Sequence, residues 1–179
     1  MTEKRVALIR GINVGRAKRI AMADLRALVE GLGYRDVRTL LNSGNVVFTD
    51  PNIDVDSAVL IEKALADQLS ISAQVIVLSS AEIATIIKGN PLGEVADNPS
   101  RFLIAILSNP ADRERLGSLT EQDWAPEVIA IGERVAYLWC PNGILVSRLP
   151  EAIGRILGNS VTTRNWATVT KLHTLLCTE

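Results

Sequence analysis

The sequence predicts an α+β protein built as a tandem duplication of ferredoxin-like βαββαβ units, each with a trailing helix. Short apolar segments alternate with segments of helical periodicity, which is typical of α+β order. A connector rich in Gly, Pro and Asn, residues 91–100, interrupts this order, and the same order follows it. We therefore expect a first ferredoxin-like half at residues 1–90 and a second at residues 101–179.

In the first half, four segments have the pattern of strands: residues 5–10, 37–41, 45–49 and 74–78. Three segments have the periodicity of helices: residues 22–32, 55–69 and 80–88. Residues 42–44, Asn-Ser-Gly, favour a hairpin between the second and third strands. Gly31 and Gly33 suit the end of the first helix, and Asp54 and Asp56 are candidate caps of the second.

The second half repeats this order, with strands expected at residues 101–107, 127–131, 134–140 and 161–163 and helices at 111–117, 148–157 and 166–177. Residues 74–78 and 102–107 are apolar on both alternating faces, so each sheet needs a cover on the side without helices. Packing of the two halves or a homodimer contact would provide it. Tyr137 and Trp139 share a strand face, and we expect them to be buried there; the alternative is an exposed platform on which bases stack.

The loop after the first strand is the candidate functional site. It holds Arg10, Gly11, Asn13, Gly15, Arg16, Lys18 and Arg19. Glycines allow left-handed turns that expose backbone N–H groups, and the start of the following helix adds partial positive charge. Such a loop suits an anion, although its spacing matches no nucleotide-binding fingerprint. The alternative is a simple turn with solvated arginines.

The split βαβ order predicts that this loop and the 42–44 turn lie at the same end of the sheet. Arg10 is the preferred contact for a phosphate, because a guanidinium binds it bidentately. Asn13, Ser43 and Asn45 would orient the attached polar group. The alternative is that Asn-Ser-Gly-Asn is an ordinary hairpin composition.

Near the C-terminus, Thr163 or Asn165 is a candidate N-cap of the last helix. Arg164 beside this helix start would add a second anion-facing patch, unless the segment only caps the helix and packs Trp166 on the core. His173 is the only histidine, and we expect packing or a surface position for it more than catalysis.

Charge is uneven along the chain. Residues 1–49 hold nine Lys or Arg against four Asp or Glu, although the formal net charge of the chain is −1. A basic first quarter favours an anionic partner, and an internal match between the halves is the alternative. Cys140 and Cys177 form no C-x-x-C pair, so the sequence indicates neither a disulfide framework nor a metal site. Without a membrane-spanning apolar run or a signal-peptide core, we expect a cytoplasmic protein with no membrane partner.

Four segments together resemble the bacterial domain-of-unknown-function family numbered one-six-nine-seven: RGINVG at residues 10–15, MADLRALVEGLGY after it, TLLNSGNVVF at 39–48 and VTTRNWATVTKL at 161–172. The resemblance covers nearly the whole chain and implies duplicated α+β units of ferredoxin-like fold. It also implies that the residues at its motif positions matter: Arg10, Gly11, Asn13, Gly15, Ser43, Gly44, Asn45, Arg164, Asn165 and Trp166. Arg16 departs from the pattern, since members usually have a second glycine there.

These patterns give three hypotheses of function. The first is a binding module for a phosphorylated small molecule, a nucleotide or a nucleic-acid backbone. The second is a small hydrolase or transferase that uses the same loops, and the third is a structural or protein-interaction domain. The predicted ligand-binding residues are Arg10, Gly11, Asn13, Gly15, Lys18, Ser43, Gly44, Asn45, Arg164, Asn165 and Trp166. Neither polar motif contains Asp or Glu, and the sequence identifies no catalytic residue, cofactor or metal.

Overall fold

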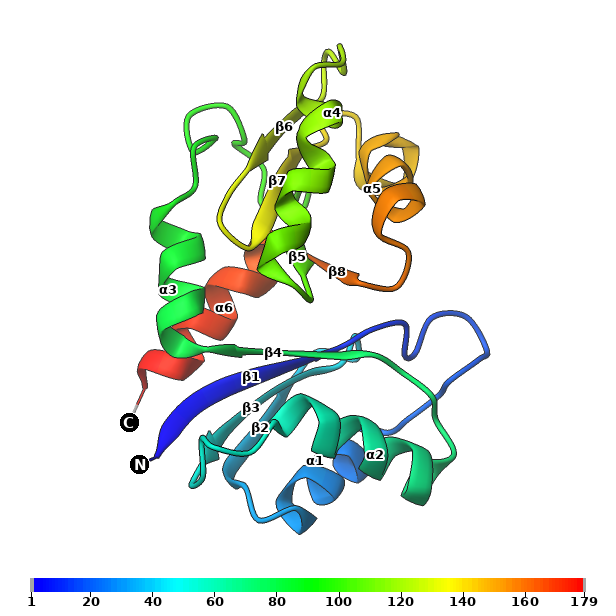
Figure 1. Cartoon of the computed structure of the whole chain (residues 1–179), viewed down its shortest axis with the longest axis vertical. Helices are drawn as coiled ribbons and strands as arrows, with labels where there is room; N and C mark the ends of the chain where they lie inside the picture. The colour runs from blue at the N-terminus through cyan, green and yellow to red at the C-terminus, as the bar shows by residue number, and fades with distance from the viewer. Residues whose placement is uncertain (1, 179) are drawn as a thin grey trace. The chain divides into compact units, whose positions relative to one another are not determined.

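A computed structural model describes residues 2–178 and shows an α+β protein. Within this range it has two four-stranded antiparallel sheets and six α-helices (Figure 1). By contacts between Cα atoms, the chain divides into two compact units. The first contains the residues up to Ile83 and those from Leu172 onward, and the second is Ala84–Lys171.

The elements of the first half follow the predicted order: β1 (Glu3–Ile9), α1 (Met22–Gly31), β2 (Arg35–Leu40), β3 (Asn45–Asp50), α2 (Ser57–Leu69), β4 (Val75–Ser79) and α3 (Ser80–Lys88). The strands pair antiparallel in the order β2-β3-β1-β4. Of the two candidate caps of α2, Asp56 is the one used: its carboxylate accepts from the amides of Ala58 and Val59 at 3.1 and 3.3 Å.

The elements of the second half are β5 (Phe102–Leu107), the 3₁₀ helix η1 (Pro110–Leu116), α4 (Gly117–Thr120), β6 (Val128–Ile131), β7 (Val135–Trp139), the 3₁₀ helix η2 (Ile144–Val146), α5 (Leu149–Leu157), β8 (Val161–Asn165) and α6 (Trp166–Cys177). Their sheet has the order β6-β7-β5-β8, which is the order of the first sheet applied to the corresponding strands.

The sequence predicts two domains, residues 1–90 and 101–179, joined by a connector at residues 91–100. This division stays a prediction. The compact units have a different composition, because the chain from Ala84 in α3 groups with the second sheet. Likewise, the end of α6 from Leu172 groups with the first sheet. A residue's unit is therefore not given by its half of the sequence.

Each sheet packs one face against its own helices. In the first unit, α1 and α2 lie on one face (Figure 1), and the core includes Ile9, Leu25, Phe48 and Leu65. Alternate strand residues on the other face are also buried: Val6, Leu8, Val47, Ile76 and Leu78. This confirms that both faces are removed from water, as the apolar strands predict. Packing of the halves and a homodimer contact stay predictions.

Tyr137 and Trp139 are buried on β7, as predicted, with exposed fractions of 2% and 7%. The Tyr137 hydroxyl donates to the carbonyl of Ile86 at 2.8 Å. Burial raises the pKa of Tyr137 to about 12, because the charged phenolate is disfavoured away from water. These rings are therefore packing residues in this structure and not an exposed platform for bases.

Candidate functional site

The loop after β1 and the turn between β2 and β3 meet at one end of the first sheet, as the topology predicts. The amide of Ile9 donates to the carbonyl of Gly44 at 2.9 Å, which fixes the turn beside the end of β1. The side-chain amide of Asn13 donates to the carbonyl of Asn42 at 2.8 Å, which joins the loop to the turn. Two segments about thirty residues apart thus form one polar surface within the first unit.

Asn13 is the residue that organises the loop. Its Nδ2 also donates to the carbonyl of Ile20 at 3.0 Å, and its Oδ1 accepts from the amide of Ile20 at 2.9 Å. The backbone amide of Asn13 donates to the carbonyl of Lys18 at 3.0 Å. The loop therefore closes on itself at both Lys18 and Ile20, and the Asn13 side chain stabilises the loop directly.

Left-handed backbone recurs through this loop, at Gly11, Asn13, Gly15 and Lys18, with φ between 51° and 72°. Glycine and asparagine adopt this region most readily, which explains their use here. Gly11 and Gly15 are exposed, and a Cβ added to either would meet nothing within 4 Å. Their role in the structure is therefore conformational and not a matter of close packing.

Gly44 in the turn is held more tightly. Its φ is +90°, and an added Cβ would lie 2.9 Å from Cδ1 of Ile12 and 3.1 Å from Cβ of Ile9. Asn45, which follows, is fully buried and donates from Nδ2 to the carbonyl of Leu40 at 2.8 Å and to Oγ of Ser43 at 2.9 Å. The S-G-N motif thus builds this turn through its own contacts.

An open pocket of about 340 Å³ lies where the loop runs into α1. It is lined by Asn13, Arg19, Ile20, Ala21, Met22 and Asn42. Arg19 is exposed and donates from Nη1 to the carbonyl of Asn13 at 3.2 Å, which uses one of the five N–H groups of its guanidinium. The pocket therefore combines a cationic side chain with two amide side chains.

The start of α1 contributes the remaining wall. Ala21 stands at the N-cap position and supplies no side-chain hydrogen bond. The first amide N–H groups of a helix have no partner within the helix, and they carry partial positive charge. An alanine at this position leaves that end of α1 without the side-chain oxygen that Ser, Thr, Asp or Asn would supply.

Sequence reasoning found part of this pocket. Asn13 is among the predicted ligand-binding residues, and the start of the following helix was expected to add positive charge, but Ala21 and Met22 were not named as its wall. The signal was present, since a helical segment that begins without a capping residue is visible in the sequence. Arg10, the preferred contact, is half-buried; its amide donates to the carbonyl of Gln74 at 2.9 Å, and its side chain does not line the pocket.

The third motif lies in the second unit. Arg164 is a β8 residue, because the strand continues two residues past its predicted end. It is buried and donates from Nη1 to Oγ1 of Thr162 at 2.9 Å and to the carbonyl of Thr163 at 2.8 Å. Burial lowers the pKa of Arg164 to about 10, since the charged form loses hydration.

Asn165 caps α6, as one of the two candidates was expected to do: its Oδ1 accepts from the amide of Thr168 at 2.9 Å. Trp166 is half-buried and packs on Phe102 with ring centroids 5.2 Å apart. Capping and packing therefore account for the observed contacts of these two residues. A ligand-binding role for Arg164, Asn165 and Trp166 stays a prediction.

The remaining candidate groups have structural positions of their own. Nε2 of His173 lies 3.6 Å from Sγ of Cys177 one turn further along α6, a contact that sequence reasoning missed. Cys140 is buried. Among residues 2–178, no cluster of three or more His, Cys, Asp or Glu could hold a metal ion. Over the same residues, no helix combines the length and the apolar character needed to cross a bilayer.

The fold and the site define a class: a two-sheet α+β protein with a polar loop pocket at one sheet end. The chain matches the family described as "Protein of unknown function (DUF1697)" over residues 1–137. The chain belongs to this family, as its motifs predicted.

A solved structure, that of the conserved bacterial protein SP0830 from Streptococcus pneumoniae, is similar to this chain. The two share 21% sequence identity with a TM-score of 0.81, over 98% of this chain and 99% of the other. This likeness shows the fold alone. No curated protein matches the chain.

Proposed function

We propose that the first unit is a binding module for a small phosphorylated molecule or nucleotide, and that the phosphate binds in the pocket beside the start of α1. The observation that carries this proposal is the pocket itself. It combines the Arg19 guanidinium, the uncapped start of α1 and the carboxamide of Asn42. Guanidinium groups and helix N-termini both bind phosphate through charge-assisted hydrogen bonds.

The charge of the loop supports an anion as the ligand. From residue 10 to residue 22 the sequence holds Arg10, Arg16, Lys18 and Arg19 and no Asp or Glu. Arg16, Lys18 and Arg19 are exposed, so their field extends into the surrounding solvent. Such a field raises the local concentration of an anion near the pocket.

Binding is favoured over catalysis at this pocket. Its six lining residues supply cationic, amide and apolar groups, and none of the six is a Ser, Cys, His, Asp or Glu that could act as nucleophile or general base. A transferase that only positions its substrate would need a second reactant with its own activating group. The alternative of a hydrolase using these loops therefore receives less support than a binding module.

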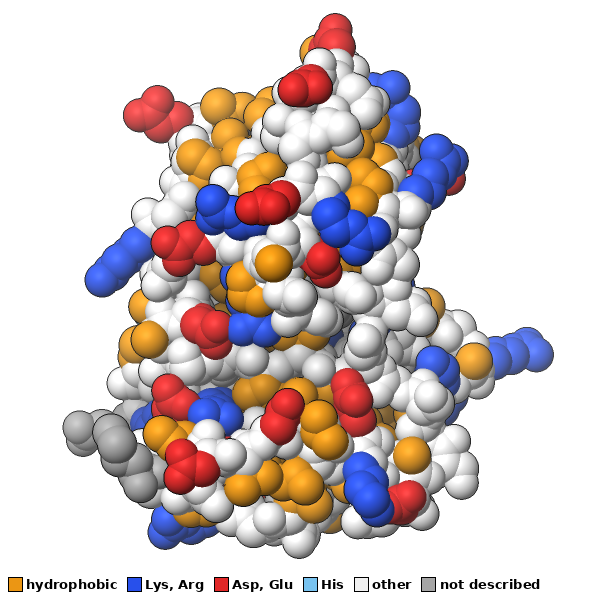
Figure 2. All heavy atoms as spheres, in the orientation of Figure 1, with side chains coloured by type: hydrophobic (Ala, Val, Ile, Leu, Met, Phe, Trp, Pro, Cys, Tyr) orange, Lys and Arg blue, Asp and Glu red, His pale blue; other side chains and the backbone are white. Residues whose placement is uncertain are grey.

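A small ligand is also favoured over a nucleic-acid backbone. On the face shown in Figure 2, basic and acidic side chains are interspersed. A protein that follows a nucleic-acid backbone typically presents a continuous basic stripe. The pocket volume of about 340 Å³ is within the range of small-molecule sites.

A structural role for the motifs is the second candidate, and Asn13 is the observation that favours it. Its side chain makes three hydrogen bonds inside the protein. Residues that only build the loop would behave in this way whether or not a ligand binds. The two candidates differ in what they predict for Arg19, which lines the pocket and gives the loop one side-chain hydrogen bond, to the carbonyl of Asn13.

The fold of each unit supports a finer proposal. We infer that both units are ferredoxin-like duplicates, because each has the βαββαβ order with its first and third strands at the centre of the sheet.

The test of function is calorimetric titration of the whole protein with inorganic phosphate and with adenosine monophosphate. Replacing Arg19 with Gln should weaken binding of either probe by about tenfold, which corresponds to the loss of a charge-assisted hydrogen bond. Arg26→Gln is the matched control, since Arg26 is exposed on α1 and pairs with Glu30 away from the pocket. Arg10→Gln tests the sequence-predicted contact in the same series.

Affinity should fall with added salt, because screening weakens the attraction. Absence of binding to the wild-type protein, or equal effects of Arg19→Gln and Arg26→Gln, would leave the structural role as the better account.

A further inference from the structure

A second hollow of about 200 Å³ lies in the first unit, at the opposite end of β1 from the loop pocket. Its walls come from β1, β2 and β3 and from the last turn of α6. None of its residues belongs to the R-G-I-N-V-G or S-G-N motif. The hollow is therefore separate from the site described above, and it stands on its own observations.

Charged groups of both signs line this hollow. Lys4 and Arg38 are the cations and Asp36 is the carboxylate. The Lys4 ammonium donates to the carbonyl of Thr178, which leaves two of its three N–H groups for another acceptor. Arg38 is exposed and makes none of the ion pairs found among residues 2–178. Two cationic donors are thus available to one small anionic group.

The carboxylate owes its position to an irregularity in β2. The register between β2 and β3 shifts between Arg35 and Arg38, and Asp36 has φ of 52°. Such a bulge changes the direction in which side chains point from an edge strand, and bulges are frequent beside functional sites. Asp36 Oδ2 accepts from Oγ1 of Thr49 at 3.2 Å, and the carboxylate keeps further lone pairs for a donor.

The floor of the hollow is apolar. Val47 of β3 is buried beneath it, and Leu175 of α6 is half-buried at its side. Ligand sites in proteins usually measure about 300–1,000 Å³, so a volume of about 200 Å³ suits a molecule smaller than a nucleotide. The ligand that fits this lining carries an anion, a cation and a short apolar or hydroxyl-bearing body.

We propose that this hollow binds a free α-amino acid with a short side chain. The carboxylate of the ligand lies against Lys4 and Arg38, its ammonium is accepted by Asp36, and its side chain rests on Val47 and Leu175. An ammonium and a carboxylate attached to one carbon match the carboxylate and the cations of the lining. A guanidinium binds a carboxylate bidentately, but it binds a phosphate or a carboxylate without an ammonium group in the same way. Arg38 alone would therefore not select an amino acid. Asp36 is therefore the residue that makes the site specific for a zwitterion.

The test is an NMR titration of the ¹⁵N-labelled full chain with L-alanine and L-serine, compared with lactate, ethylamine and inorganic phosphate. L-Alanine and L-serine should shift the amide signals of Arg38, Val47 and Thr49 saturably. Lactate and ethylamine each retain one of the two charges and should bind about tenfold more weakly or worse.

Variants locate the site. Asp36→Asn and Arg38→Gln should each weaken L-alanine binding by about tenfold, and Asp36→Asn should leave lactate binding unchanged. Arg35→Gln is the matched control, because Arg35 is an exposed β2 arginine outside the lining. All three positions are exposed, and signal dispersion in the same spectra reports whether each variant is folded.

Three outcomes would overturn the proposal. One is the lack of any saturable shift of the wild-type signals with both amino acids. Another is equal binding of L-alanine and lactate, or of L-alanine and phosphate, which would mark the hollow as a plain anion site. The third is an equal loss of amino-acid binding in Arg35→Gln and Arg38→Gln, which would place the ligand elsewhere.

Discussion

The ends of the two central strands β1 and β5 are built on the same backbone frame. In the first unit, the amide of Ile9 donates to the carbonyl of Gly44 at 2.9 Å. In the second unit, the amide of Leu107 donates to the carbonyl of Arg134 at 2.9 Å. Both donors end the first strand of their sheet, and both acceptors precede the third. The two units therefore repeat a specific hydrogen bond as well as an order of elements.

The next residue repeats the frame again. The amides of Arg10 and Ser108 donate to the carbonyls of Gln74 and Ser160, respectively, and each distance is 2.9 Å. Each acceptor comes immediately before the fourth strand of its sheet. These two backbone hydrogen bonds are therefore common to both sheet ends.

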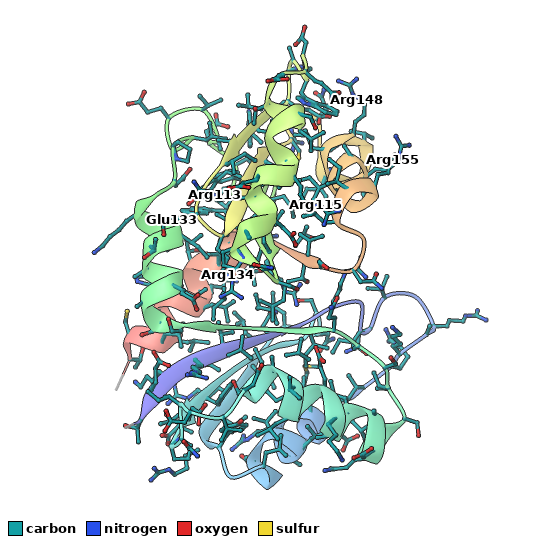
Figure 3. The ribbon with its side chains drawn as sticks, in the orientation of Figure 1. Arg113, Arg115, Glu133, Arg134, Arg148 and Arg155 are labelled. Carbon is teal, nitrogen blue, oxygen red and sulfur yellow. The ribbon has the colours of Figure 1, made fainter. Side chains whose placement is uncertain are left out.

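Beyond this frame the second unit fills its sheet end with its own side chains. Arg134, in the β6–β7 turn (Figure 3), donates from Nε to the carbonyl of Leu107 at 3.0 Å and from Nη2 to that of Ser108 at 3.2 Å. Asn109 caps η1 by accepting from the amide of Ala111 at 3.1 Å. In the first unit a glycine stands where Arg134 stands, and Ala21 gives α1 no side-chain cap. The same backbone hydrogen bonds therefore support two different sheet ends. In the second unit, Arg134 and a capped helix cover the end of the sheet, and in the first unit the corresponding end has an open pocket.

Three other arginines of the second unit are also engaged within the protein. Those labelled in Figure 3 include Arg115, which donates to the carbonyl of Ile156 at 2.6 Å, and Arg155, which pairs with Glu151 at 2.6 Å. Arg148 lies over the ring of Trp124, 5.2 Å from its centroid. Compared with these three arginines, the exposed cations of the first unit's loop are the better candidates for a ligand.

Gly44→Ala should have the largest effect on the first sheet end. A side chain at φ of +90° is strained by about 1–2 kcal/mol, and the crowding against Ile12 adds about 1–3 kcal/mol. We expect the free energy of unfolding to fall by about 2–5 kcal/mol, measured by urea denaturation. Gly11→Ala is the control, since it has a similar backbone strain in open space and should cost only about 1–2 kcal/mol. Equal losses would show that the close approach of Ile12 is not important.

Asn13→Ala should come next. It removes three side-chain hydrogen bonds, each worth about 1 kcal/mol, so stability should fall by about 2–3 kcal/mol in the same assay. The counterpart, Asn109→Ala, removes one helix cap and should cost about 1 kcal/mol. A smaller loss for Asn13→Ala than for Asn109→Ala would contradict the view that the loop depends on Asn13.

The tyrosines allow each unit to be followed separately, because Tyr34 lies in the first and Tyr137 in the second. Burial raises the pKa of Tyr137 from 10.0 to about 12, so the folded protein holds this proton more tightly than the unfolded chain. Its contribution to stability is complete below pH 10 and is lost as the pH rises towards 12, by about 2–3 kcal/mol in total. Denaturation across this range should show a flatter decline for Tyr137→Phe. If the two proteins decline in parallel, Tyr137 titrates normally.

Arg134→Gln should have the smallest effect of the four. It weakens two charge-assisted hydrogen bonds to the carbonyls of Leu107 and Ser108, and the partly buried setting suggests a loss of about 1–2 kcal/mol. Thermal denaturation at neutral pH would measure it. No loss of stability would mean that this arginine is replaceable by water, and the contrast between the two sheet ends would then lie in the caps alone.

The sequence predicted which segments meet at the end of the first sheet, but it did not predict the side-chain contacts formed there. The strand order and the hairpin at residues 42–44 follow from short-range periodicity and turn composition, so the meeting of loop and turn could be expected. The side-chain bonds of Asn13 could not, because its partners Ile20 and Asn42 depend on how the loop folds back. The position of Arg164 within β8 was not predicted for a similar reason: polar threonines beside it conceal the continuation of the strand, and only pairing with β5 reveals it.

The lining of the second hollow was likewise beyond sequence reasoning. Lys4 and Thr178 are separated by 174 positions and meet only in the folded chain. The bulge that places Asp36 changes the register of an edge strand, and alternation of apolar residues does not report such a shift. Local sequence patterns therefore identified the loop that carries the R-G-I-N-V-G motif, but they did not predict the second hollow, whose lining residues are far apart in the sequence.

The division of α6 between the units has a consequence for the order in which the chain is made. The first sheet is complete in sequence at Ser79, yet its unit also includes the residues from Leu172 onward. A ribosome adds about 5–20 residues per second, so those residues follow Ile83 after an interval on the order of ten seconds. During that interval the nascent first sheet lacks the helix end that carries Leu175 and Thr178. The part of the protein that is translated first therefore gains its remaining residues only after the whole second unit has been translated.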